Sequence, residues 1–476
     1  MRNKYSLVVA ILLTYVCTYG QNRQLLYDFN EIPQSLMVNP GVSIDFKWYA
    51  GIPATNISFQ AGSSGVAVDD IFADDGIDFT EKFAREVIYG MSNTDELSGN
   101  YQIELLNIGF RGKNEDVFYS FGIYNEGDAI GYWFRDLAIL GFEGNADNLN
   151  RRFDLSDLKT RGEVLNVYHI GLNKRMSDKL TMGVRAKVYS SVFDFNSTRN
   201  DGYFVTTEGT NNIFSNTLVS DMEWRISGIP SIREAEKDGT LANTITKRAF
   251  FGGNLGLGVD LGFTYNISDQ TVFTASLLDF GFINHSNDVR RYTLKGSATV
   301  EGVEIILPDA LTNPNQDFWD DLIDDVEELV PFEENEESYL MFRPSKLNAS
   351  IRHDWGEQIQ SNENCDCGPN VSQGGNRGIR YANSLGGHLY AINRPRGPQT
   401  ALSVFYQRRI GNILALKSSY TVDKFSFTNI GLGLNLQAGP INFYVLADNL
   451  LGYRNLANSR YQSFQFGLNI ISWGKK

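Results

Sequence analysis

The sequence has few of the features that mark helical membrane proteins, metalloenzymes or disulfide-rich secreted proteins. After residue 20, charges or glycines interrupt every apolar stretch, so none approaches the 18 or more apolar residues of a transmembrane helix. Proline is scarce, with 12 residues in 476, and the chain has only four histidines and three cysteines. Beyond its N-terminal segment, the chain is therefore expected to be either soluble or a protein that crosses a membrane with strands.

The sequence shows no pattern typical of a metal site or a catalytic site. His169, His285, His353 and His388 do not have the spacing of metal ligands. No GxSxG serine motif and no phosphate-binding Walker loop occur. We therefore predict no catalytic site, no metal, no cofactor and no enzymatic activity.

Two cysteines outside the N-terminal segment lie unusually close together. Cys365 and Cys367 are separated only by Asp366, which is too short a spacing for an ordinary loop-closing disulfide. In an oxidising compartment they could still form a strained disulfide.

The N-terminal segment resembles a secretory signal peptide. Arg2 and Lys4 precede an apolar run at 7–16 that is too short to span a bilayer, and Thr18 and Gly20 are small residues suited to cleavage before Gln21. A lipoprotein anchored through Cys17 is the alternative, but Val16 stands where a small residue is needed. We expect residues 1–20 to be removed and residues 21–476 to form a single domain.

The charge balance excludes one class of partner. The chain carries −14, and loss of Arg2 and Lys4 with the signal peptide gives −14 − 2 = −16. An acidic surface repels phosphate, and no basic cluster with interleaved aromatics offsets it. Nucleic acid is therefore not an expected partner.

Alternation with a period of two is the strongest positive signal. In residues 254–265 one face carries only leucine, valine, phenylalanine and tyrosine, and the other carries Asn254, Asp260, Thr264 and three glycines. Residues 181–189, 425–436 and 464–470 alternate in the same way, with a change of phase near Asn429. An apolar face opposite a polar, glycine-rich face is typical of strands that cross an outer membrane.

The connections also alternate in length. Short turns are predicted at 112–116, 177–179, 266–270 and 437–440, and long polar loops at 143–162, 196–250, 285–338 and 449–460. Short periplasmic turns and long external loops are expected in such barrels, although 422–424 and 356–383 depart from the rule. Strand-like sequence begins too early to leave room for a separate plug domain.

We predict an all-β, transmembrane antiparallel barrel of roughly 12 to 16 strands, with 14 favoured because such barrels have even strand numbers. The segments 42–62 and 128–141 decide the count. A few short helices are expected at 78–89, 154–161 and 317–329. The alternative is a secreted β-sandwich or propeller, which would bury its apolar faces.

Four stretches together resemble a known group of proteins. Residues 252–282 (GGNLGLGVDLGFTYNISDQTVFTASLLDFGF), 38–41, 342–346 (FRPSK) and 447–450 (ADNL) resemble uncharacterised outer-membrane barrels, a domain family of unknown function related to the PorP/SprF group. The resemblance implies a barrel of 14 strands, similar to fatty-acid transporters of the FadL type. PorP/SprF relatives serve type IX secretion and gliding motility, but the glutamine-rich mature N-terminus of that group is absent here.

A few charged residues are candidates for a site. Arg185, Lys187 and Asp260 are expected to face the lumen, where they could line a pore or form structural salt bridges. Asp279 falls on the apolar face of its strand, so either the strand has a bulge there or Asp279 reaches the headgroup region. The acidic stretches at 69–78 and 317–337 are interpreted as solvated faces.

Our leading hypothesis is a non-enzymatic barrel of the bacterial outer membrane that binds partners within a secretion or gliding-type assembly. Its partners would be outer-membrane lipid and other envelope proteins. The alternative is a FadL-like or porin-like transporter of small solutes. A transporter needs an open lumen or a lateral gap, whereas an assembly component can be plugged by its own chain.

Overall fold

The computed structural model describes residues 24–210, 213–301, 332–360 and 379–473. The predicted signal peptide, Cys365, Cys367 and the predicted helix at 317–329 lie outside these residues. Within the described part, no helix is long and apolar enough to span a bilayer.

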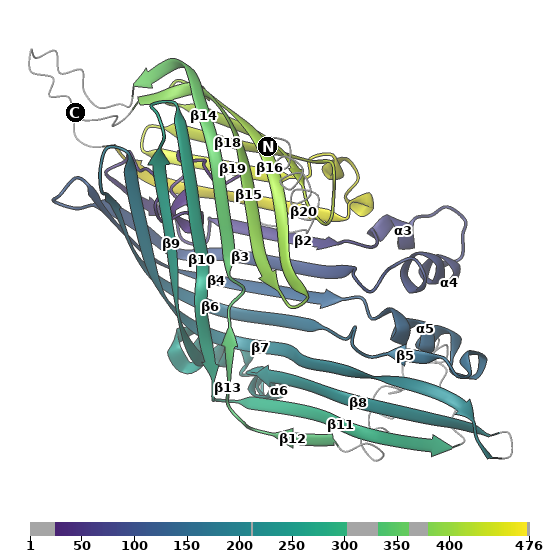
Figure 1. The fold of residues 1–476 in the computed structure, drawn as a ribbon. Helices are drawn as coiled ribbons and strands as arrows, with labels where there is room; N and C mark the ends of the chain where they lie inside the picture. The colour runs from purple at the N-terminus through teal and green to yellow at the C-terminus, as the bar shows by residue number, and fades with distance from the viewer. Residues whose placement is uncertain (1–23, 211–212, 302–331, 361–378, 474–476) are drawn as a thin grey trace, which may run out of the picture.

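The strands form a closed antiparallel barrel (Figure 1). Its wall follows the order β1/β2, β3, β4, β6, β7, β9, β10, β13/β14, β15, β16, β17, β18, β19 and β20, and β20 pairs back with β1 and β2. Two positions are interrupted strands, so the described residues make 14 wall positions, as predicted. The strands of the wall are β1 Trp48–Gly51, β2 Ile57–Ser63, β3 Glu96–Arg111, β4 Val117–Tyr132, β6 Thr160–Arg175, β7 Leu180–Glu208, β9 Asn254–Asn266, β10 Thr271–His285, β13 Tyr339–Phe342, β14 Lys346–Gln360, β15 Ile379–Arg394, β16 Gly397–Ile410, β17 Leu414–Val422, β18 Asn429–Ala438, β19 Ile441–Asp448 and β20 Tyr461–Ser472.

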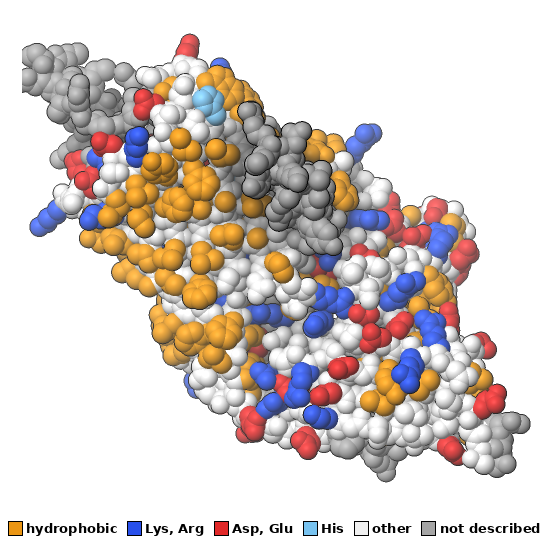
Figure 2. Space-filling view, viewed as in Figure 1, with side chains coloured by type: hydrophobic (Ala, Val, Ile, Leu, Met, Phe, Trp, Pro, Cys, Tyr) orange, Lys and Arg blue, Asp and Glu red, His pale blue; other side chains and the backbone are white. Residues whose placement is uncertain are grey.

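The burial of the strands decides between a membrane barrel and a soluble sandwich. On β9, Leu257 and Leu261 are 58% and 48% exposed, whereas Asp260 on the opposite face is 0% exposed. A soluble fold would show the reverse, because water favours polar side chains outside. Figure 2 shows apolar side chains gathered over one half of the molecule and charged side chains over the other. This apolar band and the closed wall define an outer-membrane-type barrel.

On one side of the barrel, β7 extends beyond the apolar band and forms, with β8 and β11, a sheet that we call the outer sheet. β7 pairs with β9 up to Ser191 and then with β8, and β11 pairs with β8 along its whole length. Figure 1 shows the far ends of β8 and β11 at the same end of the molecule as α3, α4 and α5, which we call the outer end. The additional strands are β5 Arg152–Asp154, β8 Phe214–Ser227, β11 Val289–Glu301 and β12 Phe332–Asn335.

Short helices connect the strands, mainly at this outer end. The helices and helical turns are α2 Ser35–Val38, α3 Val68–Phe72, α4 Phe79–Lys82, η1 Phe83–Ile88, α5 Arg135–Glu143, η2 Ala146–Asn148, α6 Ile229–Lys237, α7 Leu241–Lys247, η4 Arg248–Gly252, η5 Gly452–Arg454 and η6 Leu456–Asn458. The predicted helix at 78–89 corresponds to α4 and η1. The predicted helix at 154–161 is wrong, because β5 ends and β6 begins there.

The predicted long loops are also partly wrong. Residues 196–208 and 214–227 extend β7 and form β8, and residues 289–301 form β11. These strands lie outside the apolar band, and neither of their faces is continuously apolar. The alternating pattern that predicts membrane strands is therefore absent from their sequences.

Candidate functional site

The lumen is occupied by the N-terminal segment, residues 24–47, which we call the plug. Its apolar side chains are buried against the inside of the wall, where Leu26, Phe29 and Ile32 pack with Tyr444 and Leu446 of β19. The sequence analysis did not foresee that so short a segment fills the lumen.

The wall is recessed where the plug passes closest. A Cβ atom added at Gly183 would lie 1.9 Å from the carbonyl oxygen of Pro40, and one at Gly262 would lie 2.2 Å from Oδ1 of Asn39. Real Cβ atoms do not approach heavy atoms so closely, so only glycine fits at both positions. The glycines on the polar face of residues 254–265 thus include one that makes room for the plug.

Hydrogen bonds to backbone carbonyls hold the plug at this point. The guanidinium of Arg185 donates to the carbonyls of Leu36 and Met37 at 2.9 and 2.8 Å, at the end of α2. Ser276 donates to the carbonyl of Val38 at 2.6 Å. Carbonyls at a helix end need such donors, because no further turn satisfies them.

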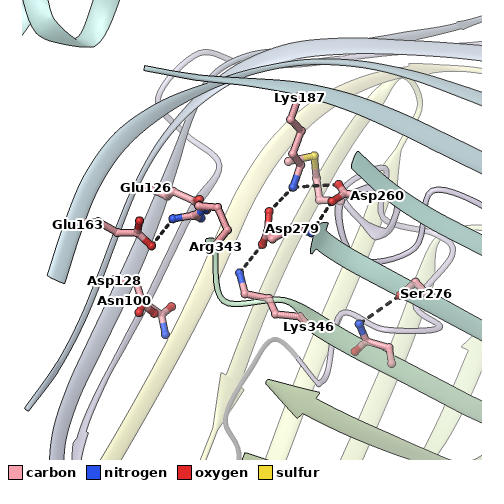
Figure 3. Close-up of polar contacts among 12 residues, drawn as sticks. Asn100, Glu126, Asp128, Glu163, Lys187, Asp260, Ser276, Asp279, Arg343 and Lys346 are labelled. Atoms are coloured by element: carbon pink, nitrogen blue, oxygen red, sulfur yellow. Dashed lines mark hydrogen bonds and ion pairs between the residues drawn. The ribbon is translucent and has the colours of Figure 1, made fainter. Parts of the chain in front are cut away.

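Arg185 also belongs to an inner ion-pair network, which comprises Arg185, Lys187, Asp260, Asp279 and Lys346. Figure 3 shows the last four of these side chains pointing toward one another. Nε of Arg185 lies 2.6 Å from Oδ2 of Asp260, and Nζ of Lys187 lies 2.9 Å from the same oxygen. Lys187 and Lys346 both bind Asp279, at 2.5 and 2.8 Å. Apart from Lys346, the side chains are almost completely buried, so each charge depends on its partners to offset lost hydration.

A bulge in β10 directs Asp279 into this network. The register with β9 shifts between Leu277 and Phe280, and Asp279 has φ of 56°. Its backbone N–H donates to Oδ1 of Asp260 at 2.7 Å. The bulge is therefore the correct one of the two explanations offered for an aspartate on the apolar face.

A second set of charges joins opposite walls of the barrel nearer its outer end. Arg343 binds Glu126 and Glu163, and Arg394 lies 2.5 Å from Asp128. Around the closed wall of 14 positions, β4 and β15 are separated by six positions in one direction and by eight in the other. They therefore lie on nearly opposite sides of the barrel, and a contact between them crosses the lumen. We call the full set the cross-lumen ion pairs: Arg343 with Glu126 and Glu163, Arg394 with Asp128, Arg396 with Asp157, and Lys424 with Glu96.

The charges of the cross-lumen ion pairs are segregated by wall. Every cation comes from the segment between β13 and the loop after β17, and every anion from the segment between β3 and β6. Figure 3 shows Arg343 pointing from its wall toward Glu126 and Glu163. The two walls are thus complementary in charge.

Between the plug and the cross-lumen ion pairs there is a cavity of about 50 Å³. It is lined by Met37 and Val38 of the plug, and by charged side chains that include Lys187, Asp279 and Arg394. One water needs roughly 10–15 Å³ measured in this way, so the cavity holds a few waters and no organic solute. Among the described residues, the plug and the cross-lumen ion pairs thus obstruct the lumen on both sides of this cavity.

Residues 40–448 match a family of unknown function, DUF5723. The chain belongs to this family. No curated protein matches the chain by sequence, and the comparisons give no support for a relationship to the PorP/SprF group.

Solved structures similar to this DUF5723 protein are outer-membrane barrels. The toluene transporter TbuX of Ralstonia pickettii is 9% identical, with a TM-score of 0.40 and coverage of 96% of both chains. A FadL homologue of Pseudomonas aeruginosa is 8% identical, with a TM-score of 0.41 and coverage of 93% of this chain and 94% of that one. The translocator domain of the autotransporter NalP from Neisseria meningitidis is 7% identical, with a TM-score of 0.32 and coverage of 89% and 88%. Such distant likenesses carry no argument about function.

In this DUF5723 protein the three residues singled out from sequence lie together. Arg185, Lys187 and Asp260 are all buried inside the barrel and belong to the inner ion-pair network. Sequence reasoning missed the cross-lumen ion pairs, although FRPSK, one of the motifs behind the resemblance, contains Arg343 and Lys346. Among the described residues no group of three or more histidines, cysteines or acids is arranged to hold a metal ion.

Proposed function

We propose that this protein is a gated transporter of small polar solutes, and that the described conformation is its closed state. The observation that carries the proposal is the recessed wall at Gly183 and Gly262, which accommodates a separate chain segment. Barrels of eight strands fill their interior with wall side chains, whereas those of 16 to 18 leave an aqueous channel. With 14 positions the lumen needs a filler, and here the filler is a segment that joins the wall covalently only where it continues into β1, and that is otherwise held by packing and hydrogen bonds.

The chemistry along the lumen supports a polar solute. The cavity between the plug and the cross-lumen ion pairs is lined by charged, amide and tyrosine side chains, including Asn100, Gln102 and Tyr390, beside a smaller number of apolar ones such as Leu278 and Ile392. A hydrophobic solute would gain nothing by displacing water from such groups. Movement of the plug together with separation of the cross-lumen ion pairs would join this cavity to both ends of the barrel.

The test is solute uptake by the full-length protein in liposomes. We expect slow swelling in small polar solutes with the natural chain and faster swelling with Gly262→Val, in which the added side chain meets Asn39. Gly387→Val is the matched control, because a Cβ at Gly387 has only one atom as near as 4.0 Å. A change of gel mobility on heating checks that each variant is a folded barrel. If folded Gly262→Val admits no solute, the plug is not a gate and the proposal fails.

A second candidate function is the one favoured by sequence, a component of a secretion or motility assembly. The outer sheet supports it, because β7, β8 and β11 carry a charged surface well beyond the barrel. Glu223 there binds Arg199, Arg225 and Arg291. In this case, crosslinking in cells should capture another envelope protein at a constant ratio, and recovery of the barrel alone would contradict it.

A further inference from the structure

A second, open pocket lies at the outer end of the barrel and shares no lining residue with the lumenal cavity. It is formed by the loop between β17 and β18 and by residues 449–460 between β19 and β20, and its volume is about 450 Å³. Pockets for small ligands are commonly about 300–1,000 Å³. This pocket can therefore hold a solute in the described conformation, which the lumenal cavity cannot.

The loops that form the pocket are held in place by their own hydrogen bonds. Nδ2 of Asn449 donates to the hydroxyl of Ser459 and to the carbonyl of Tyr461, at 2.9 and 2.8 Å. A Cβ at Gly452 would lie 2.4 Å from the Ser459 hydroxyl, so the turn there is packed as closely as glycine allows. A ligand thus meets a preformed site and does not have to order the loop, which favours binding.

Two arginines of the pocket differ from those in the lumen. Arg454 and Arg460 both line the pocket, and neither forms an ion pair with any described residue. In the lumen, by contrast, Arg185, Arg343 and Arg394 are all paired with acids. In a chain of net charge −14, two guanidiniums on one pocket that form no ion pair among the described residues suit an anionic group.

The remaining lining groups suit a hydroxyl-rich ligand. Asn455 and Asn458 offer side-chain amides, and Ser426 offers a hydroxyl. Phe425 also lines the pocket and packs against Tyr461, with ring centroids 5.7 Å apart. Amides both donate and accept hydrogen bonds, as sugar hydroxyls do. Two acids lie near the lining residues: Asp69 accepts a hydrogen bond from Asn455 at 3.5 Å, and the buried Asp423 accepts from the N–H groups of Phe425 and Ser426.

We propose that this outer pocket binds acidic saccharides, with the carboxylate on Arg454 and Arg460 and the hydroxyls on the asparagine amides. The proposal concerns binding at the outer surface and is independent of whether the lumen transports anything. Arginine recognises carboxylates through paired N–H groups, which a lysine at either position would not reproduce.

The experiment is calorimetric titration of the full-length protein in detergent with galacturonate, and with galactose as the neutral match. We expect galacturonate to bind at least about tenfold more tightly than galactose, with affinity that falls as salt rises. Arg454→Gln combined with Arg460→Gln should abolish this preference. Arg233→Gln is the control, because Arg233 is an exposed arginine on α6 without an ion pair in the described structure.

Each other result counts against the proposal. Equal binding of the two sugars would overturn the role of the arginines, and no binding of either at millimolar concentration would overturn the site. Inorganic phosphate that competes as strongly as galacturonate would reduce the site to one for simple anions. The double variant should show the same change of gel mobility on heating as the natural chain. This control shows that a loss of binding does not come from a loss of folding.

Discussion

The lumen is closed at two levels, and the two closures are built differently. The plug is held by apolar packing, by donors to its backbone carbonyls and by close contact with wall glycines. The outer closure is made by long charged side chains that meet across the lumen. Shape fixes the first closure and charge fixes the second, so the two should respond to different perturbations.

The inner ion-pair network stands between the two closures, and its neutralisation should have the largest effect. Asp260→Asn keeps an oxygen for the N–H of Asp279 but removes the charge that faces Arg185 and Lys187. Arg185, Lys187 and the partly exposed Lys346 would then have one carboxylate in the network, that of Asp279. Breaking a buried pair in this way costs about 3–5 kcal/mol. The free energy of unfolding, measured by urea titration in micelles, should fall by this amount.

A second variant tests whether charge is the cause. Lys187→Met combined with Asp260→Asn removes one charge of each sign, so the loss should be smaller than the sum of the two single losses. Strictly additive losses would mean that the two side chains act independently, against the observed contacts.

Disruption of the contact between the plug and Gly262 should have the next largest effect on stability. Gly262→Val forces a side chain against Asn39, and overpacking of this kind costs about 1–3 kcal/mol. Because the obstacle is steric, the cost should be the same in low and high salt. Limited proteolysis should cut residues 24–47 faster in this variant than in Gly387→Val, and equal rates would show that the plug adjusts without leaving the wall.

The sequence predicted the barrel because lipid imposes a strong pattern on each wall strand. Leucines 255, 257 and 261 alternate with Asp260 and glycines, and the structure places the former outside and Asp260 inside. The outer sheet was mistaken for loops, because strands in water need no continuous apolar face. The segment 128–141 was ambiguous for a local reason: β4 ends at Tyr132 and α5 begins at Arg135.

Only part of the candidate site could be predicted from the sequence. Arg185, Lys187 and Asp260 could be found because each is a charge on the polar face of an alternating strand. The cross-lumen ion pairs could not, because Arg343 and Glu126 are 217 positions apart, and Arg394 and Asp128 are 266 apart. Their pairing depends on the closure of the barrel, which the local pattern does not contain.

The cross-lumen ion pairs should give a smaller and salt-dependent effect. Arg394→Gln leaves Asp128 without its cation, but that carboxylate is 17% exposed and can recover water. We expect a loss of about 1–2 kcal/mol. Hydrogen exchange at the outer ends of β4 and β15 should rise in the variant, and in the natural chain at 1 M salt, where the screening length is about 3 Å. Unchanged exchange in both cases would mean that these pairs do not hold the walls together.

The smallest effect is expected at a buried carboxyl that lacks a cation among the described residues. Burial raises the pKa of Asp423, in the loop after β17, to about 6, although the N–H groups of Phe425 and Ser426 donate to it. The folded state therefore holds this proton more tightly than the unfolded state, whose aspartate pKa is about 3.9. Stability should fall as the pH rises from about 4 to 6, by about 1 kcal/mol because the loop can open locally.

Asp423→Asn isolates this contribution, because asparagine keeps the acceptor oxygen and does not titrate. Asp448, whose charge interacts with that of Asp423, remains in both chains, so the difference between their urea midpoints reports Asp423 together with this interaction. We expect the natural chain to lose stability relative to the variant between pH 4 and 6. The opposite sign would mean that Asp423 is stabilised as a carboxylate, as an ion-paired acid would be, and that burial at the outer loops does not govern its charge.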